Sequence, residues 1–274
     1  MKECCGSHFI LNGQLESTGS FNDSLVFKGD SIYEVIRMTK GIPVFFNDHI
    51  ERLKASLKIQ NKKLLADINA LRTDILQLTH AEKKKEINIK VVFNYNENES
   101  NYLIYYIDSA YPTSEQYNRG VKTILYFAER KDPNAKVLNY RLRSAIHQEL
   151  ANEQAYEAFL VNNDNLITEG SRSNVFFIKN GLLFTAPEDI VLKGITRKYI
   201  IQVCNEIGIE VRFECISADD ISSCQSSFIT GTSPMVLPVC CIDENHFDVS
   251  NTIMAELRRY YLKKVEKSLE SFIQ

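Results

Sequence analysis

The sequence predicts a two-domain protein of the α/β (α+β) class, on three observations. Its 274 residues exceed the length of one compact core of ordinary size, which indicates one large or two modest domains. In its first part, strand-like alternation is followed by helix-like periodicity and then by strand-like alternation again, an order that is typical of an α+β unit. A turn-rich segment over residues 111–116 separates this part from the remainder. We therefore expect a small α+β domain over residues 1–112, a linker over 113–118 and a large domain over 119–274.

The first part begins with strand signals. Residues 8–15 contain an Asn12-Gly13 turn, and residues 33–38 and 42–46 form an antiparallel hairpin pattern around Lys40-Gly41. Asn47-Asp48 can cap a helix, and Ile50, Leu53 and Leu57 then recur at near-helical spacing. The remaining elements expected here are a helix over 64–78 and strands over 87–93 and 102–107.

The second part alternates strands and helices around a turn-rich loop. That loop covers residues 130–138 and contains Asp132-Pro133-Asn134. The expected strands are 120–127, 158–161, 175–178, 182–184, 209–213, 227–230 and 236–240. The expected helices are 141–155, one that opens at Gly194-Ile195-Thr196 and runs to about residue 206, and 251–267.

Composition excludes several classes of function. The net charge of −3 gives no general attraction for nucleic acid or anionic lipid. No apolar run approaches the roughly 18 residues of a membrane span, and no signal peptide is expected. The seven cysteines show no C-x-x-C spacing, so neither a metal site nor a disulfide framework is indicated. These features favour the cytoplasm, where thiols stay reduced.

The stretch from Lys136 to Asn174 holds the most informative residues. A lysine lies at one end, and Glu169 lies in a small-residue turn at the other. A lysine that forms a Schiff base and an acid that keeps a pyridinium nitrogen protonated are what a pyridoxal phosphate enzyme needs. Spacing alone does not separate this interpretation from solvated surface residues, which most lysines and glutamates are.

Three further features could bind a phosphate group. Gly194-Ile195-Thr196 opens a helix, whose first turn offers free backbone N–H groups and the positive end of the helix dipole. Residues 230–233, Thr-Gly-Thr-Ser, supply hydroxyls and backbone donors after a strand. Arg52 can give a charge-assisted contact. A helix cap, an ordinary turn and a solvated arginine are the alternative interpretations.

The order of these motifs resembles that of the class IV aminotransferases, which include branched-chain aminotransferases, D-amino acid aminotransferases and aminodeoxychorismate lyases. The resemblance runs from about residue 29 to residue 240. The motifs that carry it are G-D-S-I-Y-E at 29–34, H-I-E-R-L at 49–53, K-V-L-N at 136–139, Y-E-A at 156–158, T-E-G at 168–170, L-K-G-I-T-R at 192–197 and F-I-T-G-T at 228–232.

The resemblance implies a fold-type IV enzyme that binds pyridoxal 5'-phosphate in the cleft between its domains and acts as a homodimer. Lys136 would be the catalytic lysine. The implied cofactor-binding residues are Arg52, Lys136, Glu169, Ser173, Asn174, Ile195, Thr196, Gly231 and Thr232. Tyr140 is a further candidate because it lies next to the K-x-L-N motif, with packing of an aromatic at the start of a helix as the alternative. The implied substrate-binding residues are Tyr33, Phe93, Thr232 and Ser233.

Two departures from the family pattern leave the substrate open. Ser31 replaces a glycine of the upstream motif, and Phe93 stands at about the position of a strand-end arginine that helps to hold the substrate carboxylate in the D-amino acid branch. Arg141 and Arg143 are candidates to replace that arginine, although a charged helix face explains both equally well. The sequence predicts an aminotransferase that uses an amino donor and a keto acid. An aminodeoxychorismate lyase is the alternative, because the K-x-L-N motif is shared with it, and a non-catalytic cofactor-binding homologue is a third.

Overall fold

The structure is a computed structural model that describes residues 3–97 and 99–273, and its chain divides into two compact units. Unit 1 comprises Met1–Ala110, Ala135–Leu138 and Val265–Gln274. Unit 2 comprises Tyr111–Asn134 and Asn139–Lys264. Unit 1 therefore contains chain segments from both sides of the 113–118 range that the sequence suggested as a linker.

Unit 1 is built on a six-stranded sheet with the order β2-β1-β6-β5-β3-β4, in which every pairing is antiparallel. The strands are β1 (Cys4–Leu11), β2 (Gln14–Ser17), β3 (Asp30–Thr39), β4 (Ile42–Pro43), β5 (Ile87–Tyr95) and β6 (Ser100–Ile107). The short helices η1 (Thr18–Ser20) and α1 (Ser24–Phe27) connect β2 to β3, and α2 (Phe46–Ile59) and α3 (Ile68–Ala81) connect β4 to β5.

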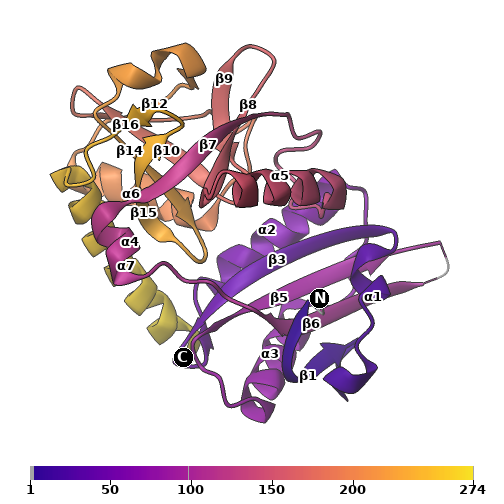
Figure 1. Ribbon diagram of the computed structural model, residues 1–274. Helices are drawn as coiled ribbons and strands as arrows, with labels where there is room; N and C mark the ends of the chain where they lie inside the picture. The colour runs from indigo at the N-terminus through magenta and orange to yellow at the C-terminus, as the bar shows by residue number, and fades with distance from the viewer. Residues whose placement is uncertain (1–2, 98, 274) are drawn as a thin grey trace. The chain divides into compact units, whose positions relative to one another are not determined.

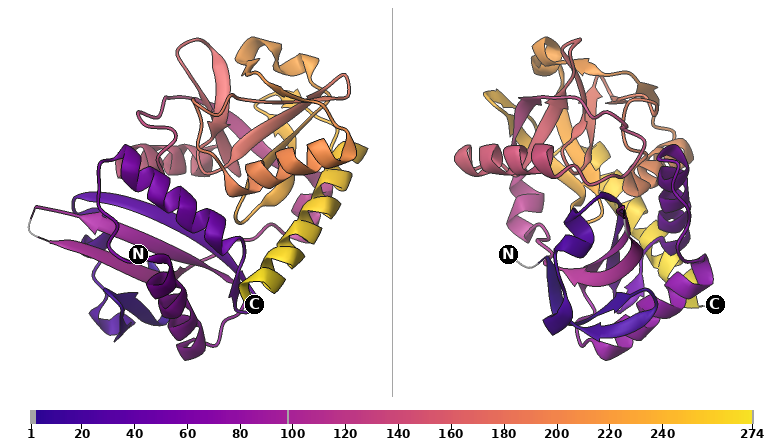
Figure 2. Two further views of the ribbon diagram at one scale, coloured as in Figure 1. Left: turned by 180° about the vertical axis from the view of Figure 1, so that it is seen from behind. Right: turned by 90° about the vertical axis from the view of Figure 1, so that its right-hand side faces the viewer.

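Both faces of this sheet are covered (Figures 1 and 2). On one face, Ile32, Val91 and Phe93 pack in a core that contains Leu53 of α2 and Ile75 of α3. On the other face, residues of the central strands pack with Phe21, Val26 and Leu138. Successive residues of a strand point to opposite faces, so the position of each residue in β5 decides which of the two cores it joins.

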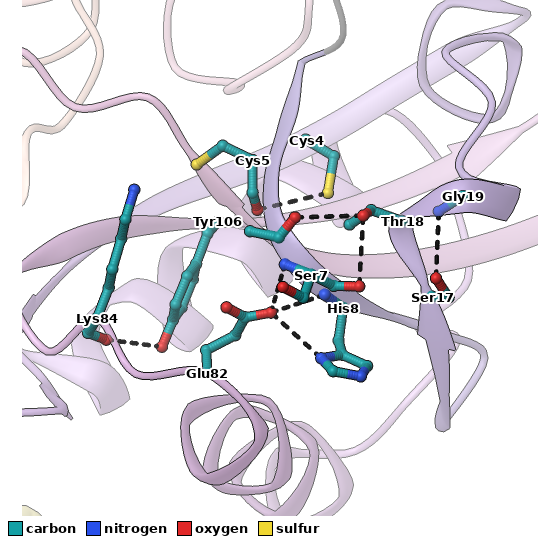
Figure 3. Close-up of polar contacts among 11 residues, drawn as sticks. Cys4, Cys5, Ser7, His8, Ser17, Thr18, Gly19, Glu82, Lys84 and Tyr106 are labelled. Atoms are coloured by element: carbon teal, nitrogen blue, oxygen red, sulfur yellow. Dashed lines mark hydrogen bonds and ion pairs between the residues drawn. The ribbon is translucent and has the colours of Figure 1, made fainter.

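The end of α3 is fastened to a bulge in β1 (Figure 3). The pairing of β1 with β6 shifts between Cys5 and Ile10, and Gly6 has φ +96°, a conformation that favours glycine. The carboxylate of Glu82 accepts hydrogen bonds from the backbone N–H groups of Ser7 and His8, both at 2.6 Å. These bonds satisfy two strand donors that the bulge removes from the ladder.

Two distant segments complete unit 1. Residues 135–138 lie along β3, where Ile32 forms an isolated antiparallel bridge with Val137. The last residues of α7 (Thr252–Ile273) belong to the same unit: Ser268 Oγ accepts a 2.6 Å hydrogen bond from the Phe45 backbone N–H, and the ring of Phe272 meets that of Phe46 edge-on.

Unit 2 is built on a second sheet with the order β12-β11-β10-β14-β15-β7-β8-β9-β13, to which β16 adds beside β15. Its strands are β7 (Val121–Phe127), β8 (Glu157–Val161), β9 (Leu166–Gly170), β10 (Asn174–Lys179), β11 (Leu182–Thr185), β12 (Val211–Phe213), β13 (Ile216–Ser217), β14 (Ser226–Gly231), β15 (Met235–Ile242) and β16 (Asn245–His246). Its helices are α4 (Ser114–Arg119), α5 (Tyr140–Asn152), α6 (Ile195–Ile207), η2 (Ala218–Ser223) and the first part of α7.

The core of unit 2 also lies on both faces of its sheet. Phe159, Val175 and Leu237 belong to one apolar cluster, whereas Ala158 and Leu160 belong to another that contains residues of α5. Because neighbouring residues of β8 join different clusters, this strand is buried on both sides. Its run of apolar residues is typical of a strand covered on both faces.

Several element boundaries differ from the sequence-based prediction. Helix α3 begins after Asp67, whose carboxylate accepts from the backbone N–H groups of Asn69 and Ala70, both at 2.9 Å. Helix α2 begins at Phe46, after Phe45 in a left-handed conformation, so Asn47-Asp48 is not its cap. Residues 114–119 form a helix with a capping box between Thr113 and Gln116. Within the described ranges, no helix has the length and apolarity to cross a membrane, and no cluster of three potential metal ligands occurs.

Candidate active site

Lys136 is fixed to the edge of β3 in unit 1. Its carbonyl oxygen accepts from Tyr33 N–H at 3.0 Å, and its own N–H donates to Ser56 Oγ at 3.1 Å. Two residues on, Leu138 N–H donates to the carbonyl of Ser31 at 3.0 Å. The backbone on both sides of the lysine is therefore held, and its Nζ lies 4.9 Å from the centre of the Tyr33 ring. Two predicted site residues, Lys136 and Tyr33, are thus neighbours in the fold.

A buried ionic cluster lies close to this lysine. Glu34 is fully buried, and its two carboxylate oxygens accept from Arg52 Nε at 2.8 Å and from a terminal Arg52 nitrogen at 2.7 Å. His49 Nδ1 lies 2.8 Å from the same carboxylate. His49, Arg52 and Ser56 share one face of α2 because they are three and four residues apart. Arg52, which the sequence predicts to bind a phosphate, thus lies on this face and forms two charge-assisted hydrogen bonds with Glu34.

The electrostatics of the cluster follow from its burial. Burial raises the pKa of Glu34, but the Arg52 guanidinium and His49 outweigh it and lower the pKa to about 2. The pKa of His49 is lowered, chiefly by burial, with the charges of Arg52 and Lys136 acting in the same direction. A neutral His49 that donates through Nδ1 leaves Nε2 as an acceptor. Lys136 therefore lies close enough to His49 to influence its titration.

In unit 2, Glu169 is a buried carboxylate held by two donors. Its Oε1 accepts from an Arg130 guanidinium nitrogen at 3.0 Å, and its Oε2 accepts from the Leu192 backbone N–H at 3.0 Å. The side chain is only 3% exposed. A buried carboxylate that is fixed by a guanidinium and a backbone donor is suited to accept a hydrogen bond from a pyridinium N–H.

The turn that follows Glu169 is organised by a second buried acid, Glu157. Its Oε1 accepts from Ser171 Oγ at 2.5 Å, and its Oε2 accepts from the Arg172 N–H at 3.2 Å and Ser173 Oγ at 2.9 Å. A Cβ on Gly170 would lie 2.1 Å from Ser173 Oγ, so any larger residue would force the Ser173 side chain away from its present position. Ser173, which the resemblance assigns to the cofactor, bonds to Glu157 in this structure.

Asn174 connects three of the predicted cofactor-binding segments. Its amide donates to the Leu192 carbonyl at 2.9 Å, and it pairs with Thr230 across β10 and β14. A Cβ on Gly194 would lie 2.0 Å from its Oδ1, so the start of α6 approaches Asn174 as closely as a glycine allows. The turns at Glu169, Gly194 and Gly231 are therefore brought to one place within unit 2.

This place has the properties of a phosphate site. The first turn of α6, which includes Ile195 and Thr196, has no side-chain cap, so its backbone N–H groups remain available to an anion. Thr230 Oγ1 is buried and has no hydrogen-bond partner among the described residues. Thr196 Oγ1 lies 3.3 Å from the hydroxyl of Tyr261. These donors, with the Glu169 carboxylate in the same unit, fit a cofactor that carries a phosphate and a pyridine nitrogen.

The turn that holds Thr232 and Ser233 is contacted by a side chain of α4. The hydroxyl of Tyr117 in α4 donates to the Pro234 carbonyl at 3.0 Å, and the Arg258 guanidinium lies 3.8 Å from the centre of the Tyr117 ring. Sequence reasoning missed this pair, as it missed Glu34, His49 and Arg130. The Tyr33-Glu34 pair and the His49-x-x-Arg52 motif could have indicated the Glu34 cluster. Tyr117, Arg258 and Arg130 carry no local signal in the sequence.

Phe93, which was expected to border the substrate, lies on the opposite face of the sheet from Tyr33. Phe93 is fully buried on the helix-covered face, 5.8 Å from the Tyr102 ring, whereas Tyr33 packs with Val92 on the other face. Successive residues of a strand point to opposite faces, so Val92 shares the face of Tyr33. The substrate role of Phe93 stays a prediction.

The other candidates for the substrate and cofactor lie on α5. Tyr140 opens this helix and is 63% exposed. Arg141 and Arg143 are both exposed on the same helix. Their positions on the surface of α5 are those of a charged helix face, which is the alternative interpretation that the sequence left open.

Comparisons with known proteins show which family this chain belongs to. Residues 31–242 match the model of the family described as amino-transferase class IV. The D-alanine aminotransferase of Bacillus licheniformis is 31% identical over 256 residues, which cover 85% of this chain and 88% of that protein. Two solved structures extend the likeness in fold. The branched-chain amino acid aminotransferase of Thermobaculum terrenum, in its PLP-form, has a TM-score of 0.83 at 19% identity, covering 98% of this chain and 97% of that one.

The second structure is described as a putative 4-amino-4-deoxychorismate lyase from Legionella pneumophila. It has a TM-score of 0.78 at 21% identity and covers 87% of this chain and 92% of that one. The expected fold-type IV architecture is thereby confirmed, and so is the sequence-based recognition of the family. This chain belongs to the class IV aminotransferase family, whose enzymes use pyridoxal 5'-phosphate.

Proposed function

We propose that this chain transfers the amino group of an amino acid or amine to a keto acid, with Lys136 as the catalytic residue. The observation that carries the proposal is the fixed position of Lys136 beside Tyr33 and the Glu34–Arg52 pair. When bound, pyridoxal phosphate supplies an electron-accepting ring that stabilises negative charge on the substrate Cα. Lys136 would be the residue that attaches the cofactor, and its amine would carry a proton to and from the substrate Cα.

The other assignments follow from the contacts of each side chain. Glu169, already held by Arg130 and Leu192, would accept the N–H of the pyridine ring. The first N–H groups of α6 at Ile195 and Thr196, the Gly231–Thr232 turn and Arg52 would bind the phosphate. Asn174 and Ser173 would hold these segments in place. Tyr33, Thr232 and Ser233 would border the substrate, and Tyr140 would cover the cofactor.

A lyase that acts on aminodeoxychorismate is the second candidate, because the K-x-L-N sequence at 136–139 is shared with that branch and the likeness to the Legionella pneumophila structure supports the same fold. Product analysis separates the two activities. Purified protein with pyridoxal phosphate would be incubated with a panel of amines and keto acids, and separately with aminodeoxychorismate. We expect amino transfer that requires the keto acid. Formation of pyruvate and 4-aminobenzoate without a keto acid would instead establish the lyase, and no turnover in either series would leave only cofactor binding.

Two further expectations belong to this proposal. We infer that the enzyme is a homodimer, as the resemblance implies, and sedimentation at catalytic concentrations tests it. A cytoplasmic location agrees with the seven free cysteines of the structure.

The roles of Glu169 and Arg52 predict different kinetic defects. Glu169→Gln keeps the shape but removes the charge that stabilises the ring proton, so kcat should fall by roughly 10²-fold or more with a smaller loss of cofactor affinity. Arg52→Ala should chiefly weaken cofactor binding, because a phosphate contact acts in the ground state. Steady-state kinetics and cofactor titrations on both variants check the difference. If both lost only cofactor affinity, the assigned division of roles would be incorrect.

A further inference from the structure

Unit 1 contains a second buried lysine beside the ring that contacts Lys136. Lys90 lies in β5, a central strand, and is 1% exposed. Its Nζ is 4.8 Å from the centre of the Tyr33 ring, and the Nζ of Lys136 is 4.9 Å from the same point. One aromatic ring therefore contacts both the proposed catalytic amine and a buried ammonium group.

The charge of Lys90 is matched by a residue from the start of the chain. The Glu3 carboxylate lies 2.5 Å from Lys90 Nζ, and its other oxygen accepts from the Tyr105 hydroxyl at 2.8 Å. Lys90 and Tyr105 are direct neighbours across β5 and β6, so the sheet itself sets their spacing. They form a carboxylate-binding pair, and Glu3 occupies it.

The three members of this cluster differ in their exposure and their freedom to move. Lys90 and Tyr105 are buried in the sheet, whereas the Glu3 side chain is 18% exposed and precedes the first strand. A rotation of the Glu3 side chain into solvent would leave Lys90 and Tyr105 to another carboxylate. Fold stability alone does not call for such a pair, because apolar residues of similar volume usually serve as well.

We propose that Glu3 is an internal competitor for this site: it occupies Lys90 and Tyr105 and so disfavours ligands that carry a second carboxylate. The proposal rests on the proposed function for the identity of the ligand as a dicarboxylic amino or keto acid. The site itself is defined by unit 1. Glu3 therefore acts as a residue that sets selectivity between ligands with one carboxylate and ligands with two.

Direct binding tests this competition without requiring turnover. Glutarate and pentanoate have the same chain length but two and one carboxylates, and each would be titrated into the holoenzyme by calorimetry. Glu3→Gln should increase the affinity for glutarate roughly tenfold relative to that for pentanoate, because a charge-assisted hydrogen bond becomes available to the ligand. Adding Lys90→Met to this variant should remove the gain. The exposed Glu99 provides a matched control, and Glu99→Gln should leave the ratio unchanged.

The outcomes that oppose the proposal are distinct. Equal changes for glutarate and pentanoate, or no change in Glu3→Gln, would overturn it, and thermal unfolding of each variant shows whether the fold persists. The double variant removes both charges together and so avoids an unpaired buried lysine.

With an active amino donor, the kcat/KM ratio of 2-oxoglutarate to 2-oxopentanoate should rise similarly in Glu3→Gln. An absence of transamination with every donor would refute the proposed function, while the glutarate titration would still decide this proposal.

Discussion

Lys136→Ala should lose at least about 10³-fold in kcat while the protein keeps its fold and still binds pyridoxal phosphate without a covalent bond. The size follows from removing both the covalent attachment and the proton carrier, since a positioned acid–base group alone contributes about 10²–10⁴-fold. The fold should persist because the bonds that fix residue 136 come from its backbone N–H and carbonyl. Single-turnover kinetics with excess cofactor would measure the loss.

A control and a rescue make this result specific. Lys58 is an exposed lysine on α2, and Lys58→Ala should keep wild-type turnover. Added methylamine should partly restore the activity of Lys136→Ala in proportion to its concentration, because a small amine can occupy the vacated volume and accept the proton. A purely structural role for Lys136 would give no such rescue.

Glu34→Gln should destabilise the protein by about 3 kcal/mol, because it leaves the largely buried Arg52 guanidinium without a counter-charge. The side chain of Arg52 is 10% exposed and that of Glu34 is 0% exposed. The same variant should bind pyridoxal phosphate more weakly, since Arg52 loses its orienting partner. Chemical unfolding at pH 7, with and without cofactor, measures both effects.

The pH dependence of stability distinguishes this buried pair from a surface pair. The pKa of Glu34 is lowered from 4.5 to about 2 in the folded protein, so its stabilising contribution is complete above pH 4.5 and is lost as the pH falls towards 2. The difference in unfolding free energy between wild type and Glu34→Gln should therefore shrink over this window. Glu51→Gln is the matched control: Glu51 is 67% exposed and pairs with Lys54 on the same helix, so its effect should be small at every pH. A difference that stays constant down to pH 2 would contradict the assigned role of Glu34.

The local motifs of the site were predictable from the sequence, whereas the contacts between distant segments were not. Glycine at 170 and 194, a carboxylate at 169 and an uncapped helix start at 195 each have a local chemical signature, and the structure brings these segments of unit 2 together through Asn174. By contrast, nothing in the local sequence shows that residues 135–138 join β3, or that Ser56 receives the Lys136 N–H from 80 residues away. Such contacts depend on tertiary packing.

The position of Phe93 shows what the pattern of a buried strand can predict. Every residue from Ile87 to Asn94 is buried, yet Ile87, Ile89, Val91 and Phe93 alternate with Asn88, Lys90 and Asn94, and this alternation assigns Phe93 to the face that packs against α2 and α3. The buried Lys90 lies near the Tyr33 ring, and its pairing with Glu3, 87 residues away, has no local signal in the sequence. Boundary errors, such as the start of α3, arose where an aspartate cap competed with apolar periodicity.

Reduction of the cofactor-loaded protein with borohydride, followed by peptide mapping, tests the central assignment most directly. The unreduced protein should absorb in the visible range, and reduction should fix one pyridoxyl group per chain. Mass spectrometry should place that group on Lys136, and Lys136→Ala should yield no labelled peptide. A label on another lysine, in particular on the buried Lys90 that shares the Tyr33 ring, would contradict the assignment of Lys136 as the catalytic residue.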